Sequence, residues 1–185
     1  MHHAFPCGHL ALDFAGTLRA RRDDRPTEML GTPADLDAWF REAGVTDGDA
    51  GSSGADLVEA VAVREAVYAL VRARLLGDPY DDEALDLVNR AAAVPSAIPQ
   101  LTAAGRRVEA TPRQALSEVA RAAVDVLSSN DAALLKECGR PECTQVYVDR
   151  SRGGRREWCA MQTCGNRMKA ATYRARNHAR NASPV

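Results

Sequence analysis

The sequence predicts an α+β fold that is mostly α: a helical body with a short N-terminal strand and a hairpin, followed by a small cysteine-rich segment. Two observations carry this prediction. Hydrophobic residues make up 45% of the 185 residues but aromatics only 5%, so the core must come from Ala, Leu and Val, which favours helices. Four of the five cysteines gather near the C-terminal end. We expect a body over residues 1–130 and a second unit over 131–185.

The first expected element is a short strand over residues 9–15. Leu10, Leu12 and Phe14 alternate with Ala and Asp13, which is the pattern of a strand with one buried face. Asp13 would lie on the opposite face, as a solvated or capping carboxylate or as a ligand-facing one.

Three helices follow in the predicted body. Thr32-Pro33 supplies a cap and a first helical residue, and Gly44 ends that helix. A long amphipathic helix spans about 54–76, and a third runs from Asp81 or Asp82 to about residue 93.

Residues 97–110 are expected to form the hairpin, because two short runs flank an Ala-Ala-Gly turn. A last body helix then begins at Thr111-Pro112, with Gln114 at the capping-box position. Ser128-Ser129-Asn130-Asp131 breaks this helix, so we place the domain boundary there.

The cysteines of the C-terminal unit predict a zinc site. Cys138 and Cys143 form one pair and Cys159 and Cys164 another, with four residues inside each pair and fifteen between the pairs. Four thiolates fill a tetrahedral Zn²⁺ shell, so the zinc would be structural. An iron–sulfur cluster, disulfides or free thiols are the alternatives.

The spacing between the cysteines suggests the local fold. A strand over 145–150, a turn at Gly153-Gly154 and a returning strand over 155–158 would make a second hairpin. Cys164 then enters a helix that reaches about residue 179. Knuckle, hairpin and a cysteine at a helix start resemble a treble-clef zinc finger.

Charge is divided unevenly along the chain. The net charge is −1, but residues from 138 onward hold ten Lys and Arg against three Asp and Glu, which leaves −8 for residues 1–137. This asymmetry is expected when one end meets a polyanion such as DNA. A solvated basic face, or a surface for an acidic partner subunit, is the alternative. The candidate nucleic-acid contacts are Arg155, Arg156, Arg167, Lys169, Arg176 and Arg180.

Two motifs carry a family resemblance over essentially the whole chain. The segment VDRSRGGRREWCAMQTCGNR resembles the CGNR zinc-finger family, and GHLALDFAGT is similar to the opening of the ABATE domain that precedes that finger. The resemblance implies a stress-induced transcription regulator that binds DNA through its finger, with a body that senses a ligand or holds a dimer. The family's opening motif usually has Asn before the Thr, where this chain has Gly16 before Thr17.

Three functional hypotheses follow. The first is a zinc-dependent, DNA-binding regulator without enzymatic activity. The second is an interaction module that forms a homodimer, with purely structural zinc. The third is a sensor of a small-molecule effector, or an enzyme, that uses the body, with Asp13, Thr17 and Arg64 as candidate ligand contacts. No run of about 20 apolar residues suggests a membrane span, and the chain's start lacks a secretory pattern, so we expect a cytoplasmic protein.

Overall fold

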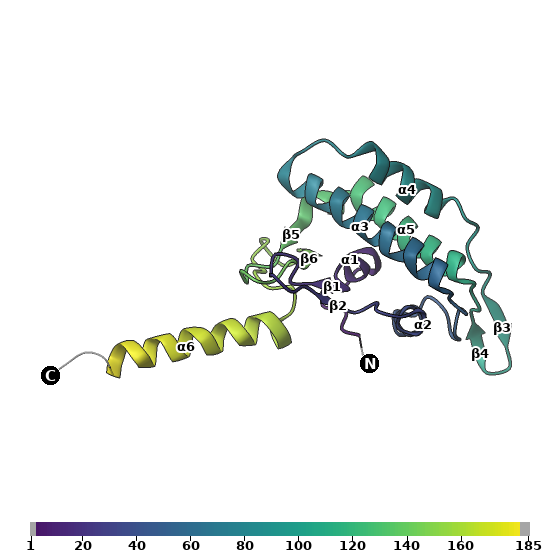
Figure 1. Ribbon diagram of the computed structural model, residues 1–185. Coiled ribbons are helices and arrows are strands. Elements are labelled where there is room, and N and C mark those ends of the chain that lie inside the picture. The colour runs from purple at the N-terminus through teal and green to yellow at the C-terminus, as the bar shows by residue number, and fades with distance from the viewer. Residues whose placement is uncertain (1–2, 182–185) are drawn as a thin grey trace.

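A computed structural model describes residues 3–181, except for the side chains of Arg176 and residues 178–181. The body is built on three packed helices, α3 (Gly54–Leu76), α4 (Asp82–Ala92) and α5 (Pro112–Ser128), with α2 (Pro33–Glu42) across one end (Figure 1). The mostly helical α+β class is therefore confirmed.

The predicted strand over residues 9–15 is wrong, because Leu10–Ala15 forms helix α1. Ala11, Leu12, Asp13, Phe14 and Ala15 are all buried between α3 and α5, so no solvent-facing side exists. A segment that is buried all round shows no helical stripe, and three alternating apolar residues then imitate a strand.

The other body helices begin and end where their caps predict. Thr32, Ser53 and Thr111 each form a reciprocal capping box with the residue three positions on, and Pro33 and Pro112 follow two of these caps. The long helix α3 stops at Gly77, whose φ of 75° is the left-handed conformation that glycine adopts without steric cost.

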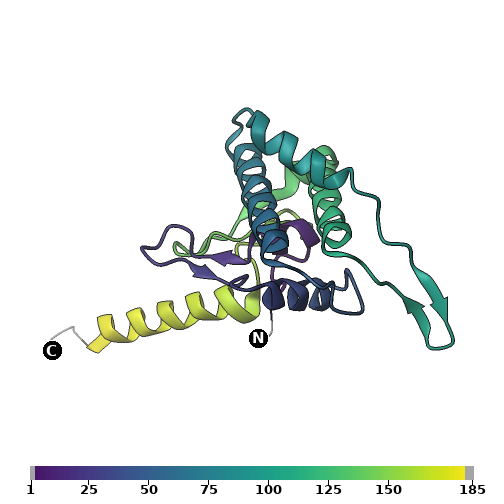
Figure 2. The ribbon, with the colours of Figure 1, turned by 45° about the vertical axis from the view of Figure 1, so that its right-hand side comes forward.

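Two short hairpins extend from the body. Strands β1 (Leu18–Arg19) and β2 (Thr27–Glu28) are antiparallel, and their loop extends to the same side of the molecule as the C-terminal helix (Figure 2). Strands β3 (Gln100–Thr102) and β4 (Gly105–Arg107) form the hairpin predicted over residues 97–110, which projects on the opposite side.

The C-terminal unit pairs different strands from those expected. Strand β6 (Val146–Val148) is antiparallel to β5 (Leu135–Glu137), while residues 155–158 form no strand. Side chains hold this return segment instead. The Asp149 carboxylate accepts from the backbone N–H of Ser151 and Arg156, and the Tyr147 hydroxyl donates to the Arg156 carbonyl at 2.6 Å. The ladder bonds of β6 therefore go to the residues before the first cysteine.

The chain ends in a helix that stands apart from the rest. After a 3₁₀ turn at Asn130–Leu134 and a π-helical turn at Met161–Gly165, α6 (Asn166–Asn181) projects away from the body (Figure 1). Residues 169–175 are all exposed, so this stretch of α6 does not pack against the rest of the finger. Met168 is half-buried and marks the end of the contact with the finger.

One hydrophobic core runs through both units. Trp39 packs edge to face with Phe14 and with Phe40 in the body, and the same cluster continues into Val146 and Tyr147 of the finger. The finger is therefore packed against the body. Among the described residues, no helix has the length and apolar character needed to cross a membrane.

Candidate metal centre and basic surface

The four predicted cysteines meet at one point. Their sulfurs lie within 4.8 Å of one another, with 3.9 Å between Cys143 and Cys159 and 3.6 Å between Cys159 and Cys164. All four side chains are buried, and none forms a disulfide.

These distances fit a metal and not a disulfide. A tetrahedron with Zn–S bonds of about 2.3 Å places its sulfurs about 3.8 Å apart, whereas an S–S bond is about 2.05 Å long. Four thiolates with no other ligand are the donor set of structural zinc. Cys138, Cys143, Cys159 and Cys164 would hold the ion, and it would supply the cross-link that a finger with few large apolar side chains lacks.

Hydrogen bonds among the sulfurs set their protonation without metal. Interactions with the Cys143 and Cys159 sulfurs lower the pKa of the Cys138 thiol, and the interaction with Cys138 raises the pKa of the Cys159 thiol. The interaction with Cys138 also raises the pKa of Cys143 to about 12. Metal binding must therefore displace protons from these two thiols.

Backbone and side chains close in around the cluster. The Cys159 N–H donates to Cys138 Sγ at 3.5 Å, and Arg140 Nη1 lies 4.0 Å from Cys164 Sγ. Gly165 follows the last ligand, and a Cβ there would lie 2.5 Å from Met161 Sδ and 3.1 Å from the Trp158 ring. A larger residue at the second position of Cys-Gly-Asn-Arg would require the Met161 side chain to move and would press against Trp158.

Two family profiles together cover almost the whole chain. ABATE, described as "Putative stress-induced transcription regulator", matches residues 8–130. The chain belongs to the ABATE family. The CGNR zinc finger matches residues 135–177, which contain all four cysteines. The protein is thus an ABATE protein with a zinc-binding CGNR finger. A comparison with curated proteins found no match.

Arg156 of this ABATE protein serves the fold. Its guanidinium lies 4.2 Å over the ring of buried Tyr147, and its nitrogens donate to the carbonyls of Trp158, Cys159 and Pro6. Pro6 belongs to the body, so this side chain ties the finger to the body. The predicted DNA contact of Arg156 is untested, but three of its five N–H donors are already used.

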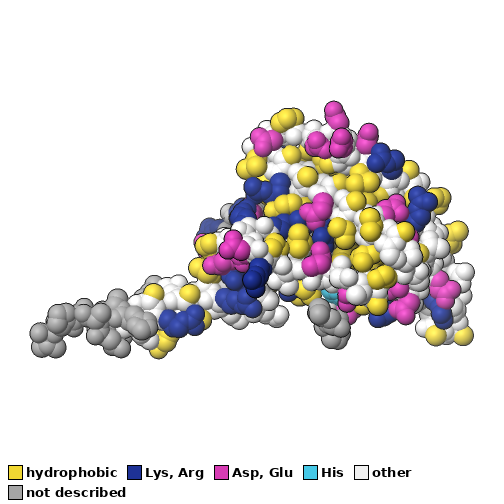
Figure 3. All heavy atoms as spheres, in the orientation of Figure 1, with side chains coloured by type: hydrophobic (Ala, Val, Ile, Leu, Met, Phe, Trp, Pro, Cys, Tyr) yellow, Lys and Arg dark blue, Asp and Glu magenta, His cyan; other side chains and the backbone are white. Residues whose placement is uncertain are grey.

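The other basic candidates are placed differently. Arg155, Arg167 and Lys169 are exposed, and no ion pair involves them within residues 3–181. The predicted contacts of Arg176 and Arg180 fall on side chains outside the described part. In Figure 3, acidic side chains gather at the end of the body where α3 leads into α4, and basic ones near the finger and on α6.

The three ligand candidates of the body are occupied by internal contacts. Asp13 accepts from the backbone N–H of Cys7 and His9, at 2.8 and 3.0 Å, and burial raises the pKa of its carboxyl. Arg64 Nη1 donates to the Thr17 hydroxyl oxygen at 3.3 Å. The Asp13 carboxylate bonds to other groups, so the structure does not bring it together with Thr17 and Arg64. Their role as ligand contacts is untested.

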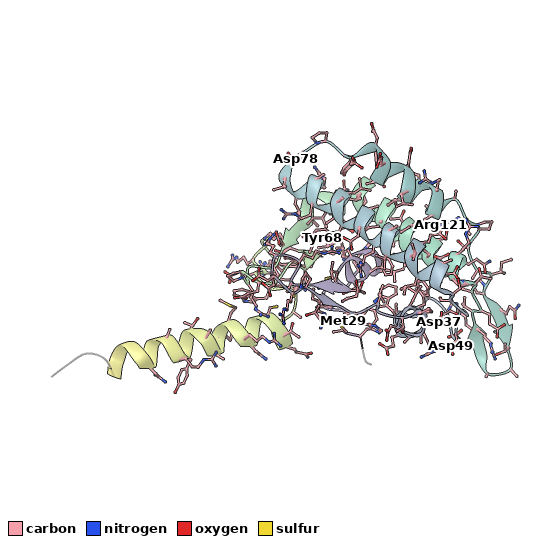
Figure 4. The ribbon with its side chains drawn as sticks, viewed as in Figure 1. Met29, Asp37, Asp49, Tyr68, Asp78 and Arg121 are labelled. Carbon is pink, nitrogen blue, oxygen red and sulfur yellow. The ribbon has the colours of Figure 1, made fainter. Side chains whose placement is uncertain are left out.

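Arg64 belongs to a buried ionic network. Its side chain is 2% exposed and binds Glu28 at 2.6 Å and Glu65 at 2.8 Å. Arg21 binds the same Glu65 at 2.5 Å and lies 3.9 Å over the ring of Tyr68, a residue of α3 labelled in Figure 4. This network fastens the β1–β2 segment to α3.

Sequence reasoning missed the residue that joins the two units. Gln145 of the finger donates from Nε2 to the Gly16 carbonyl at 2.8 Å, and its Oε1 accepts from the Cys7 thiol at 3.1 Å. A Cβ on Gly16 would lie 2.0 Å from that oxygen. The sequence signal for this contact was Gly16, where the family motif usually has Asn. Glycine has no side chain, which leaves room for Gln145.

Proposed function

We propose that this ABATE protein is a transcription regulator that contacts DNA through its finger and α6, without enzymatic activity. The observation that carries the proposal is α6 itself. It is exposed along residues 169–175, holds five Lys and Arg and no Asp or Glu, and extends away from the body.

Helix physics supports a polyanionic partner. Arg167 and Lys169 lie in the first turn of α6, where the positive end of the helix dipole disfavours cations. The helix also lacks the acidic side chains that would form intrahelical ion pairs with its cations. A DNA backbone would neutralise these charges, so α6 gains stability where it meets phosphates.

The zinc centre acts as a scaffold in this proposal. Four thiolates leave no open coordination position for a substrate, and the free thiols suit the reducing cytoplasm. The centre fixes the start of α6, because Cys164 lies two residues before that helix begins.

A DNA titration at several salt concentrations tests the proposal. Lys169→Ala and Arg155→Ala should each weaken binding and lower the slope of log K against log salt by about one unit. Arg106→Ala is the matched control, because Arg106 is exposed on the β3–β4 hairpin at the other side of the molecule. Arg156→Ala is unsuitable, since it also removes the Tyr147 contact.

Two outcomes would contradict the proposed DNA contact. If the zinc-loaded protein is not retained on DNA at about 50 mM salt, or if Lys169→Ala behaves like Arg106→Ala, the DNA assignment is wrong. A dimer that dissociates at high salt, without DNA retention, would identify the basic surface as a protein-docking site.

A further inference from the structure

A cleft of about 430 Å³ lies between part of the body and part of the finger. Arg19 and Thr27 of the β1–β2 hairpin line one wall, and Thr163 and Arg167 at the start of α6 line the other. Its volume lies within the range of small-molecule sites, about 300–1,000 Å³. None of Asp13, Thr17 and Arg64 is among its lining residues.

The charges in the cleft separate into used and unused groups. Arg140 binds Glu142 at 2.9 Å and lies beside Cys164, so it offsets the negative charge of the thiolate cluster. Arg19 and Arg167 form no ion pair within the described residues. The carboxylate of Asp23 also lines the cleft and likewise has no ion pair there. The lining of the cleft therefore holds two unpaired guanidinium groups and one unpaired carboxylate, beside the thiols of Cys143, Cys159 and Cys164.

We propose that this cleft binds a phosphate group between Arg19 of the body and Arg167 of the finger. A guanidinium presents a planar fork of N–H donors that matches phosphate oxygens, and two forks can hold one phosphate from opposite sides. The hydroxyls of Thr27 and Thr163 line the same space and can donate further hydrogen bonds. The Asp23 carboxylate opposes an anion in the same space, so binding requires both guanidinium groups.

The phosphate has two chemical sources, a DNA phosphodiester or a small phosphate ester. The first rests on the proposed function, and the second does not. Either source would bridge the two units, because each wall belongs to a different family segment. Binding would therefore add a body–finger link to those made by Gln145 and Arg156.

Titration of the zinc-loaded full chain with inorganic phosphate tests the small-ligand source. At constant ionic strength, calorimetry should show saturable binding that Arg19→Ala and Arg167→Ala each weaken about ten-fold, as expected for a lost charge-assisted bond. Arg25→Ala is the control, since Arg25 is an exposed cation in the loop between β1 and β2 but does not line the cleft. Circular dichroism and zinc content of each variant show whether it is folded.

DNA titration of the same variants tests the phosphodiester source. If both arginines hold one phosphate, Arg19→Ala and Arg167→Ala should each reduce the magnitude of the salt slope by about one unit. The double variant should show the same reduction, because the two single effects are not additive. If the protein binds phosphate but not DNA, the cleft proposal stands and the proposed function is wrong. Salt slopes and phosphate affinities that are the same for Arg19→Ala and Arg25→Ala would overturn the cleft proposal and leave the proposed function standing.

Discussion

Two buried arginines of the body and three exposed basic residues of the finger and α6 differ in their partners. In the body, Arg21 and Arg64 are buried against Glu65 and Glu28, so their charges are consumed by the fold. In the finger, Arg155, Arg167 and Lys169 are exposed without ion pairs in the described part of the chain. A count of basic residues alone would treat the two groups alike. The structure separates them: paired arginines support architecture, and unpaired ones remain available to a ligand.

The two units also differ in what keeps them folded. The body has a packed apolar core, whereas the finger depends on four thiols around a metal. The shared cluster through Val146 and Tyr147 connects these two sources of stability.

Removing zinc should have the largest effect. Structural zinc contributes an apparent free energy of about 10–16 kcal/mol in zinc-finger peptides, so a chelator or Cys159→Ser should unfold residues beyond about 135. Limited proteolysis and circular dichroism should show a cleaved finger and a body that is still helical. Cys7→Ala is the control, because Cys7 is buried outside the cluster and should leave zinc content unchanged. A finger that resists protease equally well without metal would contradict structural zinc.

A cavity in the body should destabilise the body without changing zinc binding. Phe40 is fully buried, so Phe40→Ala should lower the free energy of unfolding by about 3–5 kcal/mol while zinc stoichiometry stays the same. Urea unfolding and metal analysis measure the two quantities. Val58→Ala, at a side chain that is 70% exposed, should change stability by less than about 0.5 kcal/mol. Loss of zinc from folded Phe40→Ala would mean that the units are less separable than we infer.

Acid should weaken the finger before the body. The Cys143 thiol has its pKa raised to about 12 and that of Cys159 is raised as well, so Zn²⁺ must displace protons from both. Affinity should therefore fall with falling pH, by about 1.4 kcal/mol per pH unit for each proton displaced. Competition with a chelator at pH 6, 7 and 8 measures the slope. A pH-independent affinity would show that the cluster is already deprotonated.

The contact between the units should give the smallest effect. Gly16→Ala places a Cβ against Gln145 Oε1 and should cost about 1–3 kcal/mol. Gln145→Ala alone loses two hydrogen bonds, but combined with Gly16→Ala it removes the clash, so the double variant should be more stable than the sum of the single effects. Urea unfolding of all four proteins completes the cycle. Strict additivity would mean that Gly16 and Gln145 do not interact in solution.

Sequence reasoning succeeded where local chemistry decides. Thr32-Pro33 and Thr111-Pro112 carry their capping residues beside the helices that they start, and the cysteine spacing contains the metal cluster. It failed where tertiary contacts decide. Residues 10–15 form a helix because the body surrounds them, and 155–158 stay irregular because Asp149 and Tyr147 take their backbone groups. The hydrophobic periodicity of the sequence carries no information on either set of tertiary contacts.

The same limit applies to the sites. The ligand cysteines were predictable because the four lie close together in sequence, in two pairs. The cleft was not, because Arg19 and Arg167 are far apart in the chain and line the same cleft only when the finger packs on the body. The structural role of Arg156 was likewise hidden, since its partner Pro6 lies at the other end of the sequence.

The fit of Gln145 over Gly16 limits how this protein can be recombined with its relatives. A chimera that joined this finger to an ABATE body with Asn at position 16 would force two side chains into the space of one. Such a hybrid would need a smaller residue at 145, and the two positions should be exchanged as a pair. Body and finger can thus be matched by family and still be incompatible at a single glycine.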